Sequence, residues 1–274
     1  MDEKNIVRIE NMGSLSLSDT LCCGQSFRWR ECEEGFTGVA FGKKVTVCKE
    51  GETLLIKGAT EEDFENIWKP YFDLDTDYVA LRKDLSAKHP ILKEAAKFAP
   101  GIHILRQEPF EALISFIISQ NNNIKRIEGI VDRLCENFGE ELSDGFYAFP
   151  TAERLANLTE EDLAPLRAGF RNRYILSAAR KVHSGEVDLE ACRVLPFDKA
   201  KAQLMTIVGV GSKVADCVLL YGLHRTEAFP MDVWMKRAMS TLFPDVNPAD
   251  FGEYAGVAQQ YIFHYSRMHP ELFE

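Results

Sequence analysis

The residues best suited to chemistry lie in one segment of the 274-residue sequence, residues 204–237. Within it, Lys213 follows a Gly-Val-Gly turn and falls in the first turn of the helix that this turn is expected to open. The dipole at a helix N-terminus disfavours a cation, and together with burial it would favour the neutral amine. A neutral lysine amine is a nucleophile. The commoner role of such a residue, an exposed helix lysine, stays open at this point.

A carboxylate follows this lysine after a short loop. Asp232 stands directly before an apolar-periodic run, and this place predicts a helix N-cap. A capping carboxylate is held rigidly, as proton transfer or charge stabilisation by a carboxylate requires. Cys217 lies four residues after Lys213 and so shares its helix face. A buried thiol of this kind is most often a small apolar side chain.

The turn before Lys213 also indicates a binding function. Glycine reaches positive φ without a steric cost, so the tripeptide can join two helices tightly. The turn then directs the first N–H groups of the second helix outward, where they can bind an anion such as a DNA phosphate. Most tripeptides of this pattern are plain turns. The residues concerned are Gly209, Val210 and Gly211.

The elements around this segment predict an α+β fold. Short β-type runs between residues 27 and 56 indicate an antiparallel sheet built from hairpins. From about residue 77 the period is helical, with helices expected at 110–119, 124–138 and 249–268. We therefore expect an N-terminal α+β domain at residues 1–108 and a helical body at 109–274. The residues expected to cap helices are Thr60, Thr151, Thr159 and Asp198.

Composition and charge narrow the function further. No apolar run approaches the roughly 20 residues of a membrane span, and the N-terminus lacks a secretory signal, so we expect a cytoplasmic protein. The net charge of −10 argues against nucleic acid when taken alone. However, residues 166–183 carry five basic residues and no acid, so a positive face is expected there. A solvated helix face is the alternative for this stretch.

The seven cysteines do not predict a metal centre. Their spacing is irregular, and no C-x-x-C pair occurs, which argues against a zinc site. No closely spaced set of four cysteines occurs near the C-terminus, so we expect no iron–sulfur cluster. Reduced thiols are the expectation for most of them.

The order of turn, lysine and Pro-x-Asp loop resembles that of the helix-hairpin-helix (HhH-GPD) DNA glycosylases, and in particular the 8-oxoguanine DNA glycosylases. Further motifs carry the same resemblance in order along nearly the whole chain. They are C-G-Q-S-F-R-W-R at 23–30, Y-F-D-L-D at 71–75, L-R-Q-E-P at 105–109, S-Q-N-N-N-I at 119–124, G-F-R-N-R-Y at 169–174 and G-S-K-V-A-D-C at 211–217.

This resemblance implies a TBP-like N-terminal domain, a helical HhH-GPD glycosylase region and a bifunctional enzyme. It implies that Lys213 attacks C1′ of an 8-oxoguanine nucleotide that lies opposite cytosine in double-stranded DNA, and that Asp232 stabilises the charge on the sugar. A Schiff base and β-elimination of the strand would follow. The base is implied to bind Gly24, Cys217, Pro230, Gln259 and Phe263, and the DNA is implied to contact Asn121, Arg126, Phe170, Arg171 and the turn at Gly209, Val210 and Gly211.

The resemblance implies a monomer without a required cofactor, apart from a structural cation at the 209–211 turn. Trp234, Ser266 and Phe170 depart from the animal enzymes of the family, which places phosphate contacts and fine specificity in question. Two alternatives remain at this point. One is a glycosylase of the same superfamily for another lesion, and the other is a helix-hairpin-helix module that binds DNA without catalysis. Trapping with borohydride distinguishes the module from an enzyme.

Overall fold

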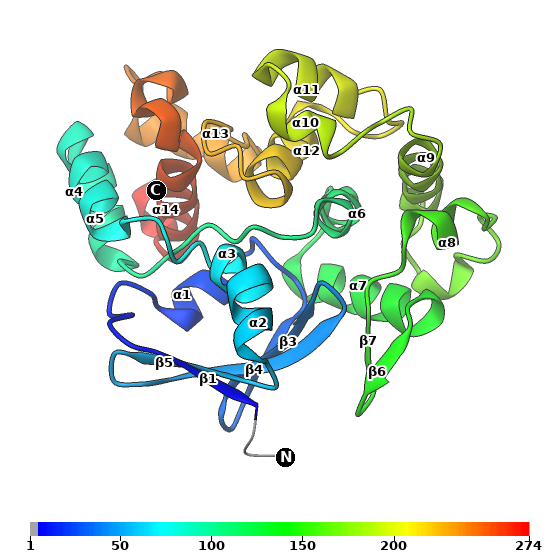
Figure 1. The fold of residues 1–274 in the computed structure, drawn as a ribbon. Coiled ribbons are helices and arrows are strands. Elements are labelled where there is room, and N and C mark those ends of the chain that lie inside the picture. Colours follow the sequence, from blue (N-terminus) through cyan, green and yellow to red (C-terminus); the bar gives the residue numbers. More distant parts are fainter. Residues whose placement is uncertain (1–4, 274) are drawn as a thin grey trace.

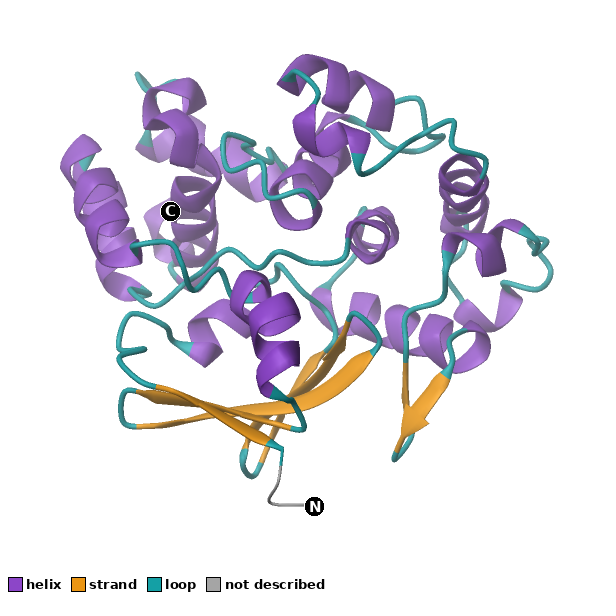
Figure 2. Ribbon diagram, viewed as in Figure 1, coloured by secondary structure: helices purple, strands orange, loops and turns teal. Residues whose placement is uncertain are grey.

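The computed structural model describes residues 5–273. A β-sheet lies at one side of the molecule, and the helices form a broad arc over it with helix α6 near the centre (Figure 1). Strands are confined to the sheet and to one small hairpin, as the colouring by secondary structure shows (Figure 2). The predicted α+β class is confirmed.

The sheet has five antiparallel strands in the order β1-β5-β4-β3-β2. Strands β2 to β5 follow one another as hairpins, and β1 adds to the free edge of β5. Gly38 faces Trp29 across β3 and β2, and a Cβ at this position would lie 2.4 Å from the indole ring. The bounds are β1 Ile6–Ile9, β2 Trp29–Cys32, β3 Gly35–Ala40, β4 Lys43–Glu50 and β5 Thr53–Lys57.

One face of the sheet is covered by short helices that bring aromatic rings together. Thr60 caps the first of them in a capping box with Asp63, as predicted for Thr60. Trp29 packs against Trp68, and its indole N–H donates to the Tyr71 hydroxyl at 2.8 Å. The helices are α1 Leu17–Leu21, α2 Glu61–Asp63, the π-helical turn η1 Phe64–Trp68 and α3 Lys69–Tyr71.

The remaining elements form the helical body. They are α4 Tyr78–Lys88, α5 Pro90–Phe98, α6 Pro109–Ser119, α7 Ile124–Phe138, β6 Glu141–Ser143, β7 Phe146–Tyr147, α8 Ala152–Ala156, η2 Ala164–Leu166, α9 Arg171–His183, α10 Ala191–Val194, α11 Phe197–Leu204, α12 Ser212–Cys217, η3 Val218–Gly222, α13 Val233–Leu242, η4 Pro248–Tyr254, α14 Ala255–Met268 and η5 Pro270–Phe273. Helix α6 is buried along almost its whole length, which explains its continuous apolar sequence.

The apolar core of the body extends beyond the expected domain boundary. Tyr78, Leu85 and Leu92 of α4 and α5 belong to this core, and α5 packs against α14. The buried ion pair between Arg28 and Glu111 also joins the N-terminal region to α6. Burial is the main influence on Glu111 and raises the pKa of its carboxyl to about 7. The division after residue 108 stays a prediction, and the two parts share a packed interface.

Several local predictions can be compared with the structure. The helix over 124–138 and the caps at Thr60 and Thr151 are confirmed. Asp198 is not a cap, because α11 begins at Phe197 and Asp198 lies within its first turn. The expected helix over 249–268 is wrong at its start. Gly252 has a φ of 77° and separates the 3-10 turn η4 from α14.

Candidate active site

A lysine and a carboxylate line one small pocket in the helical body. The pocket lies between α12, the loop before α13, α14 and the N-terminal loop that follows α1. It is lined by both predicted catalytic residues and all five predicted base-contacting residues, together with two aromatic residues. The lining residues are Gly24, Phe116, Lys213, Cys217, Tyr221, Pro230, Asp232, Gln259 and Phe263.

Helix periodicity explains three of these positions. Lys213, Cys217 and Tyr221 recur every four residues along α12 and the π-helical turn η3, so they face the same side. Lys213 follows the hairpin between α11 and α12. There Gly209 has a φ of 84°, and a Cβ at that position would lie 2.3 Å from the Tyr174 ring. Only glycine fits this turn, and the turn fixes where α12 and its lysine begin.

The Lys213 amine is held by neighbours on α6. Its Nζ donates to the Ser119 hydroxyl at 3.2 Å, and it lies 5.3 Å from the centre of the Phe116 ring. Ser119 in turn donates its hydroxyl proton to the Phe116 carbonyl at 2.8 Å. The Ser119 oxygen therefore offers its lone pairs to the amine. This arrangement fixes the position of the amine at the pocket.

Asp232 reaches the same pocket from the other side. Its carboxylate accepts a hydrogen bond from the Met235 N–H at 2.8 Å and caps α13, which confirms the predicted N-cap. Within residues 5–273, Lys213 and Asp232 form no ion pair at 4.0 Å or less. The two groups therefore face a shared cavity without neutralising one another directly.

The thiol of Cys217 lines the same pocket, one helical turn after Lys213. Burial is the largest influence on this group and raises its pKa to about 11, although the charge of Lys213 acts in the opposite direction. A buried thiol with such a pKa is neutral at pH 7 and is a poor nucleophile. Cys217 is therefore suited to packing against a bound group, which leaves Lys213 as the candidate nucleophile of the pocket.

Glutamine side chains organise the opposite wall. The Tyr221 hydroxyl donates to Gln259 at 3.3 Å and also contacts Gln260, and Gln260 donates to the Cys23 carbonyl at 3.2 Å. Because Gln259 and Gln260 are almost fully buried, their side chains are held in one orientation. The amide of Gln259 is thereby presented at the pocket.

The loop at Gly24 is fixed on both sides, but its own carbonyl is free. The carbonyl of Cys23 accepts from Gln260, and the carbonyl of Gln25 accepts from Gln107 at 2.6 Å. The carbonyl of Gly24 accepts no hydrogen bond from residues 5–273. Gly24 has a φ of 90°, so glycine is required by backbone conformation here.

Comparison with known proteins decides the family. Residues 8–113 match the model of the 8-oxoguanine DNA glycosylase N-terminal domain, and residues 114–248 match that of the HhH-GPD superfamily base excision DNA repair proteins. The N-glycosylase/DNA lyase of Saccharomyces cerevisiae is 35% identical over 259 residues, which cover 83% of this chain and 68% of the yeast protein. The chain belongs to the 8-oxoguanine DNA glycosylase family.

Solved structures of this family have the same fold. The Clostridium acetobutylicum 8-oxoguanine glycosylase/lyase in complex with double-stranded DNA containing cytosine opposite 8-oxoguanine is 39% identical, with a TM-score of 0.91 over 98% of this chain and 97% of that chain. The structure of MBOgg1 in complex with a low-affinity DNA ligand is 42% identical, with a TM-score of 0.94 over 98% of each chain. These similarities confirm the family resemblance that the motifs predicted.

The pocket of this glycosylase family member is narrow. It encloses about 50 Å³. A water molecule occupies about 30 Å³, and a cavity that binds benzene measures about 150 Å³. A two-ring purine therefore enters only if the walls separate. Phe263 is a side chain that can move, because it is only partly buried and its ring packs against the exposed Arg267.

The predicted DNA-contacting residues lie outside this pocket. Asn121 is exposed in the loop after α6 and has a φ of 47°. Phe170 is 50% exposed at the start of α9, and Arg126 is exposed on α7. Arg171 is different, because its buried guanidinium donates to the carbonyls of Gln120, Asn121 and Ala168. Its contact with an unpaired cytosine stays a prediction, and in this structure it holds the Asn121 loop.

Some pocket residues were not predicted from the sequence. Phe116 and Ser119 lie one turn apart on α6, and both contact Lys213. Tyr221 continues the four-residue spacing of Lys213 and Cys217, and this spacing is a signal that could have identified it. Of the two departures at the C-terminal end, Trp234 is partly exposed on α13 and Ser266 is buried on α14.

Proposed function

We propose that this protein is a bifunctional DNA glycosylase and lyase that excises 8-oxoguanine opposite cytosine from double-stranded DNA. The observation that carries the proposal is that Lys213 and Asp232 face one cavity whose other walls suit a flipped base. A base inside a duplex cannot reach this cavity, so the nucleotide must leave the helix.

Lys213 supplies the nucleophile in this proposal. The neutral amine attacks C1′ of the sugar, the N-glycosidic bond breaks, and its electron pair leaves with the base, which takes up a proton. Opening of the sugar ring gives a Schiff base between Nζ and C1′. Loss of a proton from C2′ then expels the 3′ phosphate, which nicks the strand. The hydrogen bond to Ser119 supports this role, because it orients the amine at the cavity.

Asp232 acts on the charge that this chemistry creates. Positive charge develops on the sugar as the base departs, and a fixed carboxylate lowers the energy of that state. The same carboxylate can relay protons during ring opening and elimination. Its bond to the Met235 N–H holds it in place, so little reorganisation is required as the charge forms.

The free carbonyl of Gly24 is proposed to select the oxidised base. 8-Oxoguanine carries a hydrogen on N7, which that carbonyl can accept, whereas guanine presents a lone pair there. A buried hydrogen bond left unmade costs roughly 1–3 kcal/mol. The flanking carbonyls already have donors, which leaves Gly24 as the acceptor on this wall. Gln259 would read the Watson–Crick edge, Cys217 and Phe263 would sandwich the ring, and Pro230 would line its edge.

The exposed residues are proposed to hold the opened duplex. Asn121 would fill the space left by the flipped nucleotide, and Phe170 would wedge into the stack. Arg126, with Arg171, would donate to O2 and N3 of the unpaired cytosine. The hairpin at residues 209–211 would bind a backbone phosphate, and the space in front of Gly211 is open for this approach.

The proposal also covers the oligomeric state, the cofactors and the location of the protein. We expect a monomer that requires no cofactor, with a structural cation at the hairpin as the one bound ion to test for. No helix within residues 5–273 is long and apolar enough to cross a membrane. We place the protein in the cytoplasm, at the nucleoid where its substrate lies.

Excision from defined duplexes tests this function. The protein is incubated with a duplex containing 8-oxoguanine opposite cytosine, with and without borohydride, and released base, nicked strand and covalent adduct are measured. We expect all three products. A helix-hairpin-helix module without catalysis would give binding and no products. A panel of other oxidised, alkylated and mispaired bases distinguishes a glycosylase of different specificity, which would release one of those bases faster than 8-oxoguanine.

A further inference from the structure

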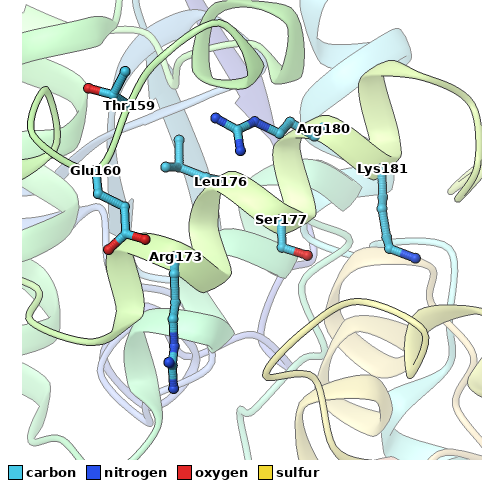
Figure 3. Close-up of a pocket in the computed structure, with 7 residues that line it drawn as sticks. All are labelled: Thr159, Glu160, Arg173, Leu176, Ser177, Arg180 and Lys181. Atoms are coloured by element: carbon cyan, nitrogen blue, oxygen red, sulfur yellow. The ribbon is translucent and has the colours of Figure 1, made fainter.

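A second, larger concavity lies on α9, outside the base pocket. It measures about 520 Å³ and is formed by one face of α9 together with the turn before residue 164. Arg173, Ser177 and Lys181 project from successive turns of α9, and Glu160 lies beside the Arg173 end of this helix (Figure 3). We call this concavity the α9 groove. Its lining residues are Thr159, Glu160, Arg173, Leu176, Ser177, Arg180 and Lys181.

The α9 groove is aligned with the proposed wedge. Phe170, Arg173, Ser177 and Lys181 are spaced by three or four residues, so they share one face of the helix. Phe170 is half exposed at the N-terminal end of this face. A strand of DNA that meets Phe170 can therefore continue along the same face.

The hairpin borders the α9 groove on another side. The Ser177 oxygen accepts a hydrogen bond from the Val208 N–H at 3.3 Å, and Tyr174 lies directly under Gly209. The Ser177 hydroxyl proton has no acceptor among residues 5–273, so it remains available to a ligand. The proposed phosphate-binding turn and the α9 groove thus form one continuous surface.

The α9 groove contains three basic side chains, which differ in how far they are already engaged. Arg173 is exposed, and its guanidinium lies over the Tyr174 ring at 4.9 Å. Lys181 is paired with the exposed Glu186. Arg180 has a structural task, because it donates to two backbone carbonyls near α8. Glu160 is the one acidic residue in the lining. Glu161 and Asp162 follow Glu160 in the same turn, so the exposed Arg173, close to Phe170, is the basic group most available to an anion.

We propose that the α9 groove binds the phosphodiester backbone of the duplex that flanks the lesion, beyond the nucleotides held by the hairpin. Arg173 and Lys181 are separated by eight residues, or about 12 Å along a helix. Measured along the duplex axis at about 3.4 Å per step, this length corresponds to about three to four base-pair steps. The inference rests on the proposed function for its orientation relative to the lesion.

An extended anion fits the α9 groove better than a small one. Arg173 and Lys181 lie two helical turns apart and Ser177 lies on the turn between them, so the polar groups of the groove are distributed along about 12 Å of the helix. The groove contributes affinity and register along the duplex, and it takes no part in base selection.

The test removes two charges from the α9 groove. The double variant Arg173→Ala, Lys181→Ala is compared with the wild type for binding to an undamaged duplex over a range of salt concentrations. Each lost phosphate contact should reduce the salt slope by about 1, so we expect a decrease of about 2 and roughly tenfold weaker binding at about 0.1 M salt. The matched control is Lys93→Ala, Lys97→Ala, which removes two exposed lysines from α5 on the opposite side of the molecule (Figure 1).

A second variant, which is expected to change DNA binding in the opposite direction, controls for effects of misfolding. Glu160→Gln removes the acidic group from the lining, so we expect tighter binding to the same duplex and a steeper salt slope. Weaker or unchanged binding by Glu160→Gln would contradict the proposal. Equal losses in the two double variants would overturn it, because the effect would then be one of net charge alone. Unchanged duplex binding by the groove variant would equally overturn it, and a partner such as an acidic peptide would then be the occupant to seek.

Excision separates this inference from the proposed function. At saturating enzyme, the groove variant should release 8-oxoguanine at the wild-type single-turnover rate, since the base pocket is unchanged. If wild-type protein excises no 8-oxoguanine, the proposed function fails, whereas duplex binding by the groove variant still reports on the groove. If the wild type excises 8-oxoguanine and the groove variant binds the duplex as tightly as the wild type does, only the inference about the groove fails.

Discussion

The base pocket and the DNA-facing surface differ in how firmly their side chains are held. In the pocket, Gln259 and Asp232 are fixed by hydrogen bonds, and Lys213 bonds to Ser119. On the surface, Arg126 and Phe170 are exposed, and the groups that would hold them belong to DNA. The fold therefore preorganises the chemical groups, whereas we expect the contacts with the opened duplex to form only on binding.

The largest expected effect comes from removing the proposed nucleophile of the base pocket. Lys213→Gln should abolish the borohydride adduct and the nicked strand, because no amine then faces C1′. Binding to the lesion duplex should persist, because the surface residues are unchanged. Single-turnover excision measures the loss of activity, and a gel-shift titration measures binding to the lesion duplex. Lys236→Gln is the matched control, since this lysine is exposed on α13. Full trapping by Lys213→Gln would place the nucleophile elsewhere.

The next largest effect separates the proposed catalytic role of the Asp232 carboxylate from its role as a helix cap. Asp232→Asn should reduce the single-turnover rate by about 10²- to 10⁴-fold, the range typical of a lost acid–base group. Asparagine caps helices about as well as aspartate, so the melting temperature should stay close to that of the wild type. A rate near that of the wild type would mean that Asp232 serves only as the cap of α13.

A smaller effect tests how the amine is positioned. Ser119→Ala removes the acceptor for the Lys213 Nζ, and we expect about a tenfold lower rate of base release with unchanged duplex affinity. The matched control is Ser115→Ala, which removes a hydroxyl one turn earlier on α6. Equal rates for the two variants would show that preorganisation of the amine does not depend on Ser119.

The smallest expected effect lies on the surface. Arg126→Ala should flatten the preference for cytosine, because an exposed arginine contributes only after the duplex opens. Excision rates from duplexes with each of the four opposite bases measure this preference. The neighbouring exposed residue gives the control Lys125→Ala, which should keep it. Equal wild-type rates for all four duplexes would remove the role proposed for Arg126.

Sequence patterns were most informative where chemistry depends on local spacing. The turn before Lys213 and the cap at Asp232 are local features, and both occupy the predicted places. The hydrogen-bond partners could not be predicted in the same way. Ser119 is 94 residues from Lys213 and Gln260 is 237 residues from Cys23, so their contacts exist only through the fold.

The same distinction holds for the fold. The amphipathic period of α7 gave its bounds, whereas the four-residue strand β1 was missed because it is short and pairs with a strand more than 40 residues away. The packing of α5 against α14 likewise depends on tertiary contacts. Such contacts decide how the N-terminal region and the helical body share a core.

The most direct test of the central claim is to map the site of the borohydride adduct. The protein is reacted with a duplex containing 8-oxoguanine opposite cytosine, reduced, digested with protease, and analysed by mass spectrometry. We predict a single modified peptide from residues 204–237, with the sugar remnant on Lys213. An adduct on another lysine or on the N-terminal amine, or none while base is released, would contradict it.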